Sequence, residues 1–271
     1  HRGTITVADT SLGPGTFLGN HSVIPAGHAW PAGMFIGVGT VADAGRVGEG
    51  TAWFGLPPME LPRREIVEAD RHLTHNPGTL RYVTRLFWET LRLGLPIVPL
   101  VVAFVWYVTL LHAGRQVAGP AFHLLAAPLV TLGAGAALVG AVLVLKWVLL
   151  GQVRPAQHPL WSCWCSRWDF LYVAWNQWAR HLLSRLEGTL MLNAVLRLMG
   201  MRIGRGVVLG PGFSQVVDPD MLTFEDGATV ACDLQAHTFE DRILKIDRVR
   251  VRRGATVGHH TVVFYGADVG E

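Results

Sequence analysis

Two parts of this sequence repeat with a period of six residues, and this period constrains the fold more than any other feature. In the first part an aliphatic or aromatic anchor recurs at Leu12, Leu18, Ile24, Trp30 and Ile36, each followed by glycine or proline. The second part starts with Ile203-Gly204 and Leu209-Gly210 and continues at Val251, Val257, Val263 and Val269. Such hexads predict a left-handed parallel β-helix in two segments, in which three hexads make one coil and the small residues permit tight corners.

Two alternatives compete with this interpretation of a glycine-rich chain. Ordinary strands with chance glycines would not place five anchors in register. A nucleotide-binding domain would need G-x-G-x-x-G or a P-loop, and the sequence contains neither. The net charge of +3 is too small to indicate nucleic-acid binding.

Between the repeats lie two long apolar runs. The 22 residues of Leu93 to Gly114 and the 30 residues of Gln116 to Leu145 contain no Asp, Glu, Lys or Arg. Because a helix of about 20 apolar residues spans a bilayer, these runs predict a transmembrane helical hairpin. A pair of buried helices in a soluble protein is the alternative, and the second run is too long and too evenly apolar for it.

Basic residues near the ends of the hairpin indicate its orientation. They are Arg81, Arg85 and Arg92 before the first run and Lys146 and Arg154 after the second, whereas the connecting loop has only Arg115. We therefore expect an integral protein of the inner or plasma membrane with both β-helix parts in the cytoplasm. Lys146 is expected to snorkel towards the headgroups.

A tryptophan-rich segment follows the hairpin, with Trp161, Trp164, Trp168, Trp175 and Trp178. On a helix these five side chains fall within an arc of roughly 100°. This pattern predicts an interfacial helix with indoles at headgroup level, and packing in a protein core is the alternative.

These features divide the chain into five segments. Residue 1 is His and the sequence stops within a repeat, so we expect a fragment of a longer polypeptide. The segments are the end of one β-helix domain (1–62), a juxtamembrane linker or helix (63–93), the transmembrane hairpin (94–150), Trp-rich interfacial helices (151–202) and the start of a second β-helix domain (203–271).

Candidate chemistry is concentrated where the second repeat region loses its six-residue rhythm. There His237 lies close in sequence to Asp233, Glu240 and Asp241. A histidine can act as a general base in acyl transfer, and a nearby carboxylate can orient its ring. We therefore predict His237, Asp233 and Glu240 as catalytic residues. A surface histidine beside a solvated charge cluster is the alternative.

The other histidines and the cysteines indicate no further site. His21, His28, His259 and His260 are expected at corners or exposed positions of the repeats. Cys163-x-Cys165 lacks a second pair that would complete a tetrahedral metal site, so no metal is predicted. Three cysteines without framework spacing are typical of a reducing compartment.

The order of parts resembles the C-terminal membrane region of poly-lysine-synthetase-like non-ribosomal peptide synthetases. In that family acetyltransferase-like β-helix domains alternate with pairs of transmembrane helices. The resemblance rests on four stretches that follow one another as in the family: Trp53 to Arg64, Glu187-Gly188-Thr189, Leu196 to Arg205 and His237 to Lys245.

The resemblance implies an enzyme of the acyltransferase type that forms amides. A phosphopantetheine thioester on a carrier domain, or coenzyme A, would donate an acyl or aminoacyl group to an amine. Implied partners are membrane lipid, carrier and adenylation domains of the same polypeptide, and adjacent β-helix domains in a pseudo-threefold or oligomeric assembly. This fragment alone is expected to be inactive. The alternative is a non-catalytic β-helix scaffold that organises the carrier domain at the membrane.

Overall fold

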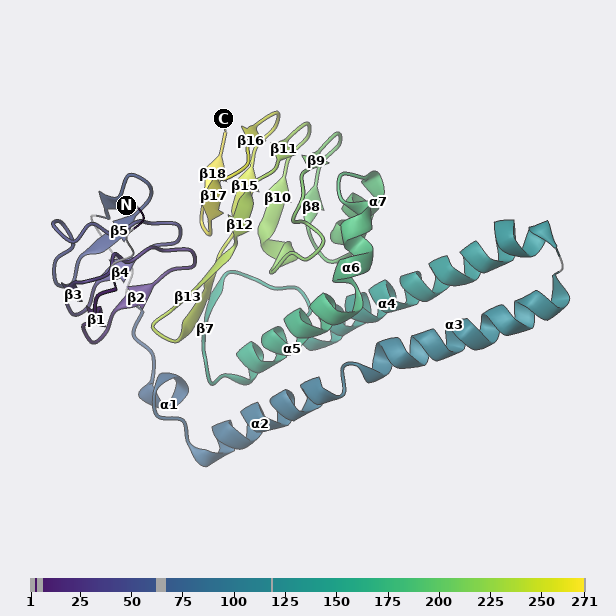
Figure 1. The fold of residues 1–271 in the computed structure, drawn as a ribbon, viewed down its shortest axis with the longest axis horizontal. Helices are drawn as coiled ribbons and strands as arrows, with labels where there is room; N and C mark the ends of the chain where they lie inside the picture. The colour runs from purple at the N-terminus through teal and green to yellow at the C-terminus, as the bar shows by residue number, and fades with distance from the viewer. Residues whose placement is uncertain (1–2, 4–6, 62–66, 118, 271) are drawn as a thin grey trace. The chain divides into compact units, whose positions relative to one another are not determined.

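The computed structural model describes residues 3, 7–61, 67–117 and 119–270 (Figure 1). By its internal contacts the chain forms two compact units, His1–Glu68 and Ala69–Glu271. Part of the resemblance motif, residues 62–64, lies outside the described residues.

The first unit consists of short strands that pair in parallel across coils. Ser11 pairs with Ala29 and Phe17 with Phe35, in both cases 18 residues apart, as three hexads per coil require. Gly13 follows the first anchor, and a Cβ there would lie 2.4 Å from the backbone nitrogen of Ala32 in the next coil. The strands are β1 (Ser11–Leu12), β2 (Phe17–Leu18), β3 (Ala29–Trp30), β4 (Phe35–Ile36), β5 (Ala52–Phe54) and β6 (Met59–Glu60).

The core of this unit contains the anchors Trp30 and Ile36 together with Met34 and Trp53. Strand β6 pairs antiparallel with β5 and ends the run of parallel strands. The 18-residue spacing of the pairs is the one that three hexads per coil predict, and the left-handed β-helix itself stays a prediction.

The second unit contains three parallel sheets, ordered β18-β15-β10-β8, β16-β11-β9 and β12-β17, whose short strands lie side by side in Figure 1. Arg202 pairs with Thr223 and Thr223 with Arg250, which are 21 and 27 residues apart, so more than three hexads lie between successive paired strands. The strands are β8 (Arg202–Ile203), β9 (Val208–Leu209), β10 (Leu222–Phe224), β11 (Thr229–Val230), β12 (Asp233–Gln235), β15 (Val249–Val251), β16 (Thr256–Val257), β17 (Val262–Phe264) and β18 (Asp268–Val269).

The longest insertion is a β-hairpin formed by β13 (His237–Glu240) and β14 (Ile243–Ile246). Asp241 and Arg242 connect the strands, and both have positive φ angles, 50° and 61°, as a two-residue type I′ turn requires. Strand β7 (Ala156–Pro159) pairs antiparallel with β14 and completes a three-stranded sheet. The sequence around His237 therefore leaves the hexad rhythm as the first strand of a hairpin.

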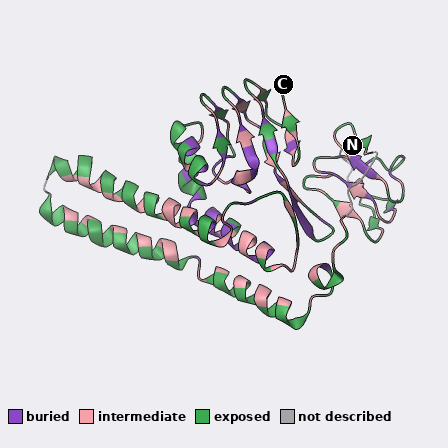
Figure 2. Cartoon of the chain, turned by 180° about the vertical axis from the view of Figure 1, so that it is seen from behind, coloured by how far each residue is buried: buried purple, intermediate pink, exposed green. Residues whose placement is uncertain are grey.

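Helices make up the rest of the second unit. Two helical stretches, Arg71–Gln116 and Phe122–Leu149, are long and apolar enough to cross a membrane, and few of their residues are buried (Figure 2). Trp106 Nε1 on one donates to Thr131 Oγ1 on the other over 3.1 Å. The elements are α1 (Arg71–Thr74), α2 (Thr79–Leu93), α3 (Ile97–Gln116), the π-helical η1 (Phe122–Ala126), α4 (Ala127–Leu149), α5 (Cys163–Trp178), α6 (Arg180–Leu183), the 3-10 helices η2 (Ser184–Leu186) and η3 (Pro219–Met221), and α7 (Leu190–Leu198).

The tryptophans of α5 do not all take the expected place in the headgroup layer. Trp175 and Trp178 are 2% and 8% exposed and belong to the core of the unit. Their indole nitrogens donate to the carbonyls of Ser214 and Leu95 at 3.0 and 2.8 Å. These two side chains are packed in the protein core, where the segment between β9 and η3 and the start of the apolar hairpin supply their hydrogen-bond partners. An interfacial position of the helix as a whole stays a prediction.

Lys146, in the last turn of α4, does not snorkel as expected. Its side chain is 1% exposed, and its Nζ lies 2.9 Å from Asp220 Oδ2. The ammonium group remains inside the protein because a buried carboxylate compensates its charge there.

Candidate functional site

The structure brings a buried carboxylate against His237, and it is Asp218. Asp218 Oδ2 lies 3.1 Å from His237 Nδ1; the aspartate side chain is 1% exposed and the histidine side chain 25%. The pair is a close contact of charged groups, because within the described part of the chain neither atom has a partner whose angles fit a hydrogen bond. The negative charge of a carboxylate this close favours a proton on Nδ1, which leaves Nε2 as the basic nitrogen.

Trp168 on α5 holds both members of this pair. Its Nε1 donates to Asp218 Oδ1 at 2.9 Å, so one carboxylate oxygen is fixed by the indole and the other faces the imidazole. The indole and the imidazole of His237 are nearly perpendicular, at 79°, with centroids 5.3 Å apart. The tryptophan therefore limits the movement of the carboxylate and of the ring together.

Local backbone geometry places the two partners. Asp218 is the N-cap of η3 and has a left-handed conformation, with φ 55° and ψ 54°, which aspartate tolerates better than most residues. His237 is the first residue of β13 and pairs with Ile246 of β14. The site thus combines a strained turn with the base of an inserted hairpin.

The structure does not bring Asp233 and Glu240 to His237 in the way that their sequence distance suggested. Asp233 is exposed on β12, which pairs with β17. Glu240 lies three residues after His237 on β13 and therefore on its opposite face. Its Oε2 is 3.3 Å from Lys245 Nζ, and both side chains are almost fully buried. A catalytic role of Asp233 or Glu240 stays a prediction that needs its own test.

Sequence reasoning missed Asp218 and also His158, which lies on the same sheet face as His237. His158 pairs with Leu244 of β14, two residues before the partner of His237, so both rings project to one side of the sheet. His158 stacks on Trp164, with centroids 3.8 Å apart and an angle of 8°. Two tryptophans four residues apart on α5 therefore contact the two histidines.

Burial lowers the pKa of His158; the charge of Asp218 opposes this effect and that of Arg167 adds to it. The folded protein thus favours the neutral ring, whereas the unfolded chain takes up a proton near pH 6.5. We expect the melting temperature to fall as the pH is lowered from 7.5 to 5.5, and to fall less in His158→Phe, which keeps a ring against Trp164. Differential scanning fluorimetry measures this, and an equal fall in both proteins would contradict it.

The space next to Asp218 on the inner side is small. A cavity of about 20 Å³ is lined by residues that include Trp168, Tyr172, Val217 and Asp218. This volume is enough for one water molecule and far too small for a pantetheine arm. A substrate must therefore approach His237 from the side on which its ring is exposed.

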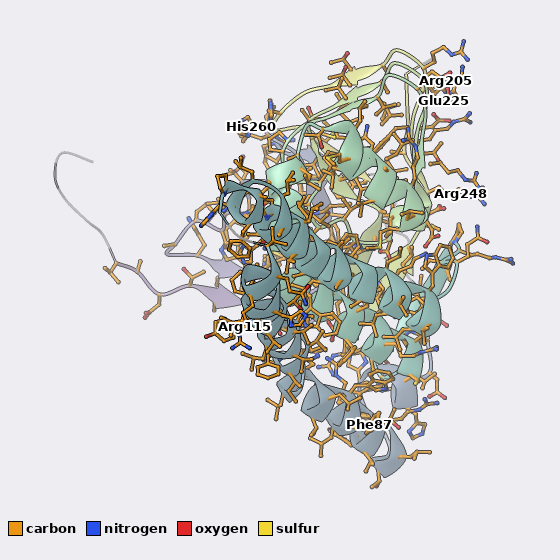
Figure 3. All side chains as sticks on the ribbon, turned by 90° about the vertical axis from the view of Figure 1, so that its right-hand side faces the viewer. Phe87, Arg115, Arg205, Glu225, Arg248 and His260 are labelled. Atoms are coloured by element: carbon orange, nitrogen blue, oxygen red, sulfur yellow. The ribbon has the colours of Figure 1, made fainter. Side chains whose placement is uncertain are left out.

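The remaining histidines of the repeats lie where we expected them. His21, His28, His259 and His260 are exposed, and His21 and His260 have the positive φ angles of corner residues. Figure 3 shows His260 on one side of the second unit, with Arg205, Glu225 and Arg248 along the other. Among the described residues, His, Cys, Asp and Glu form no group of three that could hold a metal ion.

The three cysteines differ in reactivity. Cys163 is exposed, whereas Cys165 and Cys232 are buried and burial raises their pKa to about 11. At pH 8 iodoacetamide should label Cys163 at least about tenfold faster than the other two, because the thiolate is the reactive form. Mass spectrometry of the native protein, with a denatured sample as control, measures the rates, and equal labelling of all three in the native protein would contradict the expectation.

Comparison with known proteins identifies one informative relative. The chain is 31% identical, over 274 residues and 98% of its own length, to Delta-poly-L-ornithine synthetase of Acinetobacter baumannii (strain AB307-0294). The chain spans 20% of the length of that protein. No family model and no solved structure matches. The match supports a relationship to poly-amino-acid synthetases.

Proposed function

We propose that this chain is a membrane-embedded part of a poly-amino-acid synthetase-like enzyme and that His237 serves acyl or aminoacyl transfer to an amine. The observation that carries the proposal is the pair formed by His237 and the buried carboxylate of Asp218. The similarity to a poly-ornithine synthetase supports the general class of amide-forming enzyme. The thioester donor would approach His237 from the exposed side of its imidazole ring.

In the proposed reaction His237 moves protons while Asp218 holds its ring. A pantetheine thioester, when bound, supplies an activated carbonyl carbon. The amine nitrogen attacks this carbon and forms the new C–N bond, while Nε2 of His237 accepts a proton from the amine. The C–S bond then breaks, and the imidazolium returns the proton to the departing thiolate. Asp218 stabilises the imidazolium between these two transfers.

We also propose that the two apolar helices cross the membrane and that the β-helix parts lie on its cytoplasmic side. The exposed apolar surface of both helices and the basic residues at their ends support this arrangement. It would hold the segment containing His237 close to one membrane face.

His237→Ala in the full-length protein tests the catalytic proposal. We expect product formation to fall by about 10²- to 10⁴-fold, the usual contribution of a general base, while thioester loading stays normal. Product formation should fall as far in His237→Gln, because glutamine is polar but cannot act as a base. Normal product formation in both variants would overturn the catalytic role.

A scaffold without catalysis is the second candidate. The contacts of Trp168 with Asp218 and His237 would also serve to fix α5 to η3 and β13, and this favours a structural role for the pair. The scaffold predicts that His237→Ala leaves product formation intact but lowers the stability of the protein. The same two variants therefore distinguish the candidates.

A further inference from the structure

We infer that Lys146 is a positioning residue: its buried ion pair with Asp220 fixes the end of the apolar hairpin to the turn that presents Asp218 to His237. The inference rests on the proposed function and goes beyond it, because it links the membrane part of the chain to the site. It assigns Lys146 no contact with substrate. Its effect is transmitted through the backbone of η3.

The ion pair is enclosed by the protein on several sides. Lys146 Nζ lies 3.1 Å from Asp220 Oδ1 and 2.9 Å from Oδ2, and the two side chains are 1% and 3% exposed. The backbone nitrogen of Val153 donates to Oδ2 at 3.3 Å. Gly200 closes another side, where an added Cβ would lie 2.2 Å from Oδ1. Asp220 therefore has little freedom to move while Lys146 holds it.

The distance along the chain from Asp220 to the site is short. Asp218 and Asp220 belong to one tight turn, closed by a hydrogen bond of 2.9 Å from the nitrogen of Met221 to the carbonyl of Asp218. Pro219 stands between them and restricts the backbone further. A displacement of Asp220 must therefore change the position of Asp218 relative to Trp168 and His237.

The end of α4 is also attached to the end of α7. Trp147 Nε1, next to Lys146, donates to the carbonyl of Leu198 at 2.9 Å, and the Lys146 ammonium lies 3.5 Å from the centre of the Trp147 ring. A buried ion pair adds little net stability compared with apolar side chains, so a fixed position is a better account of its presence than stability. Movement of the hairpin in the membrane would reach the site by this route.

The test compares Lys146→Met and Asp220→Asn with wild type in the full-length protein reconstituted in lipid. We expect each variant to lower kcat by about 10- to 100-fold, the effect of a displacement near 1 Å, and to leave the KM for the amine acceptor within about twofold. The rate at which diethyl pyrocarbonate modifies His237, followed by mass spectrometry, should change by at least about threefold. Asn193→Ala is the control, because it removes a buried hydrogen bond to Val207 in the same unit, far along the chain from the turn. It should lower the melting temperature without these two effects.

Each outcome decides the inference. Wild-type kcat and wild-type His237 modification in a folded Lys146→Met protein would overturn it. If the single variants do not fold, Lys146→Met combined with Asp220→Leu replaces the pair by apolar groups, and this double variant should fold but keep the low kcat. If His237→Ala is fully active, the proposed function fails, and the modification rate of His237 alone then shows whether Lys146 positions the ring.

Discussion

Asp218→Asn should lower amide formation by about 10²- to 10⁴-fold while the amount of folded protein stays near wild type. The asparagine amide can present an N–H group to His237 Nδ1 where the carboxylate presents an acceptor. The ring would then favour a proton on Nε2, the nitrogen that must act as base. Trp168 can still donate to the amide oxygen, so the turn keeps one of its two fixed contacts. Initial rates of product formation by the full-length protein measure the effect.

The control for this variant is Asp268→Asn, which removes an exposed ion pair with Arg252 in the same unit. Exposed pairs contribute little, so its rate should remain within about twofold of wild type. Asp233→Asn and Glu240→Gln, measured alongside, test the carboxylates that the sequence suggested. If Asp218→Asn is as active as the control, the pair with His237 has no catalytic part.

Gly200→Ala should destabilise the second unit by about 3–5 kcal/mol, as breaking a buried ion pair does when it leaves a charge uncompensated inside the protein. Gly200 has a φ of 110°, which side chains disfavour, and the new methyl group would lie 2.2 Å from Asp220 Oδ1 and 3.2 Å from Lys146 Nζ. The residue must therefore strain its backbone and displace the ion pair together. Thermal unfolding in detergent should show a fall of the order of 10 °C.

Gly206→Ala provides the matched comparison. Gly206 also has a positive φ, 66°, but nothing lies within 4 Å of its added Cβ. Gly206→Ala should lower the free energy of unfolding by about 1–2 kcal/mol, because only the left-handed backbone conformation is strained. Equal melting temperatures for the two variants would show that the enclosure of the Lys146–Asp220 pair has no energetic importance.

The parallel pairing of the short strands could be predicted because the six-residue period is local. Each anchor and its following glycine are adjacent in sequence, so the pairing of Ser11 with Ala29 follows from counting three hexads. For the same reason, the sequence showed that the segment around His237 departs from the repeats, because the six-residue spacing of the anchors is interrupted there. The third strand of this sheet, β7, could not be predicted in this way, because its pairing with β14 joins two distant segments of the sequence.

The site was only half visible from the sequence. His237 could be found as a histidine outside the repeats, but its carboxylate was sought among near neighbours, and Asp218 reaches it only through folding. A signal for it is present in the sequence Asp218-Pro219-Asp220, which is typical of a turn and lies inside a repeat region. For Trp175 and Trp178 the helical arc was correct, but an arc of indoles is the same whether lipid or protein covers it. In the same way, the sequence does not distinguish a lysine at a helix end that snorkels from one that forms a buried ion pair, as Lys146 does.

The most direct test of the proposed site is a single-turnover measurement on the full-length protein. The thioester is loaded first, the excess activated amino acid is removed, and the amine acceptor is then added while the remaining thioester is followed. The proposed role of His237 predicts normal loading and a transfer step slowed by at least about 10²-fold in His237→Ala. Transfer at the wild-type rate in that variant would contradict the catalytic role of the His237–Asp218 pair and leave the scaffold as the function of this segment.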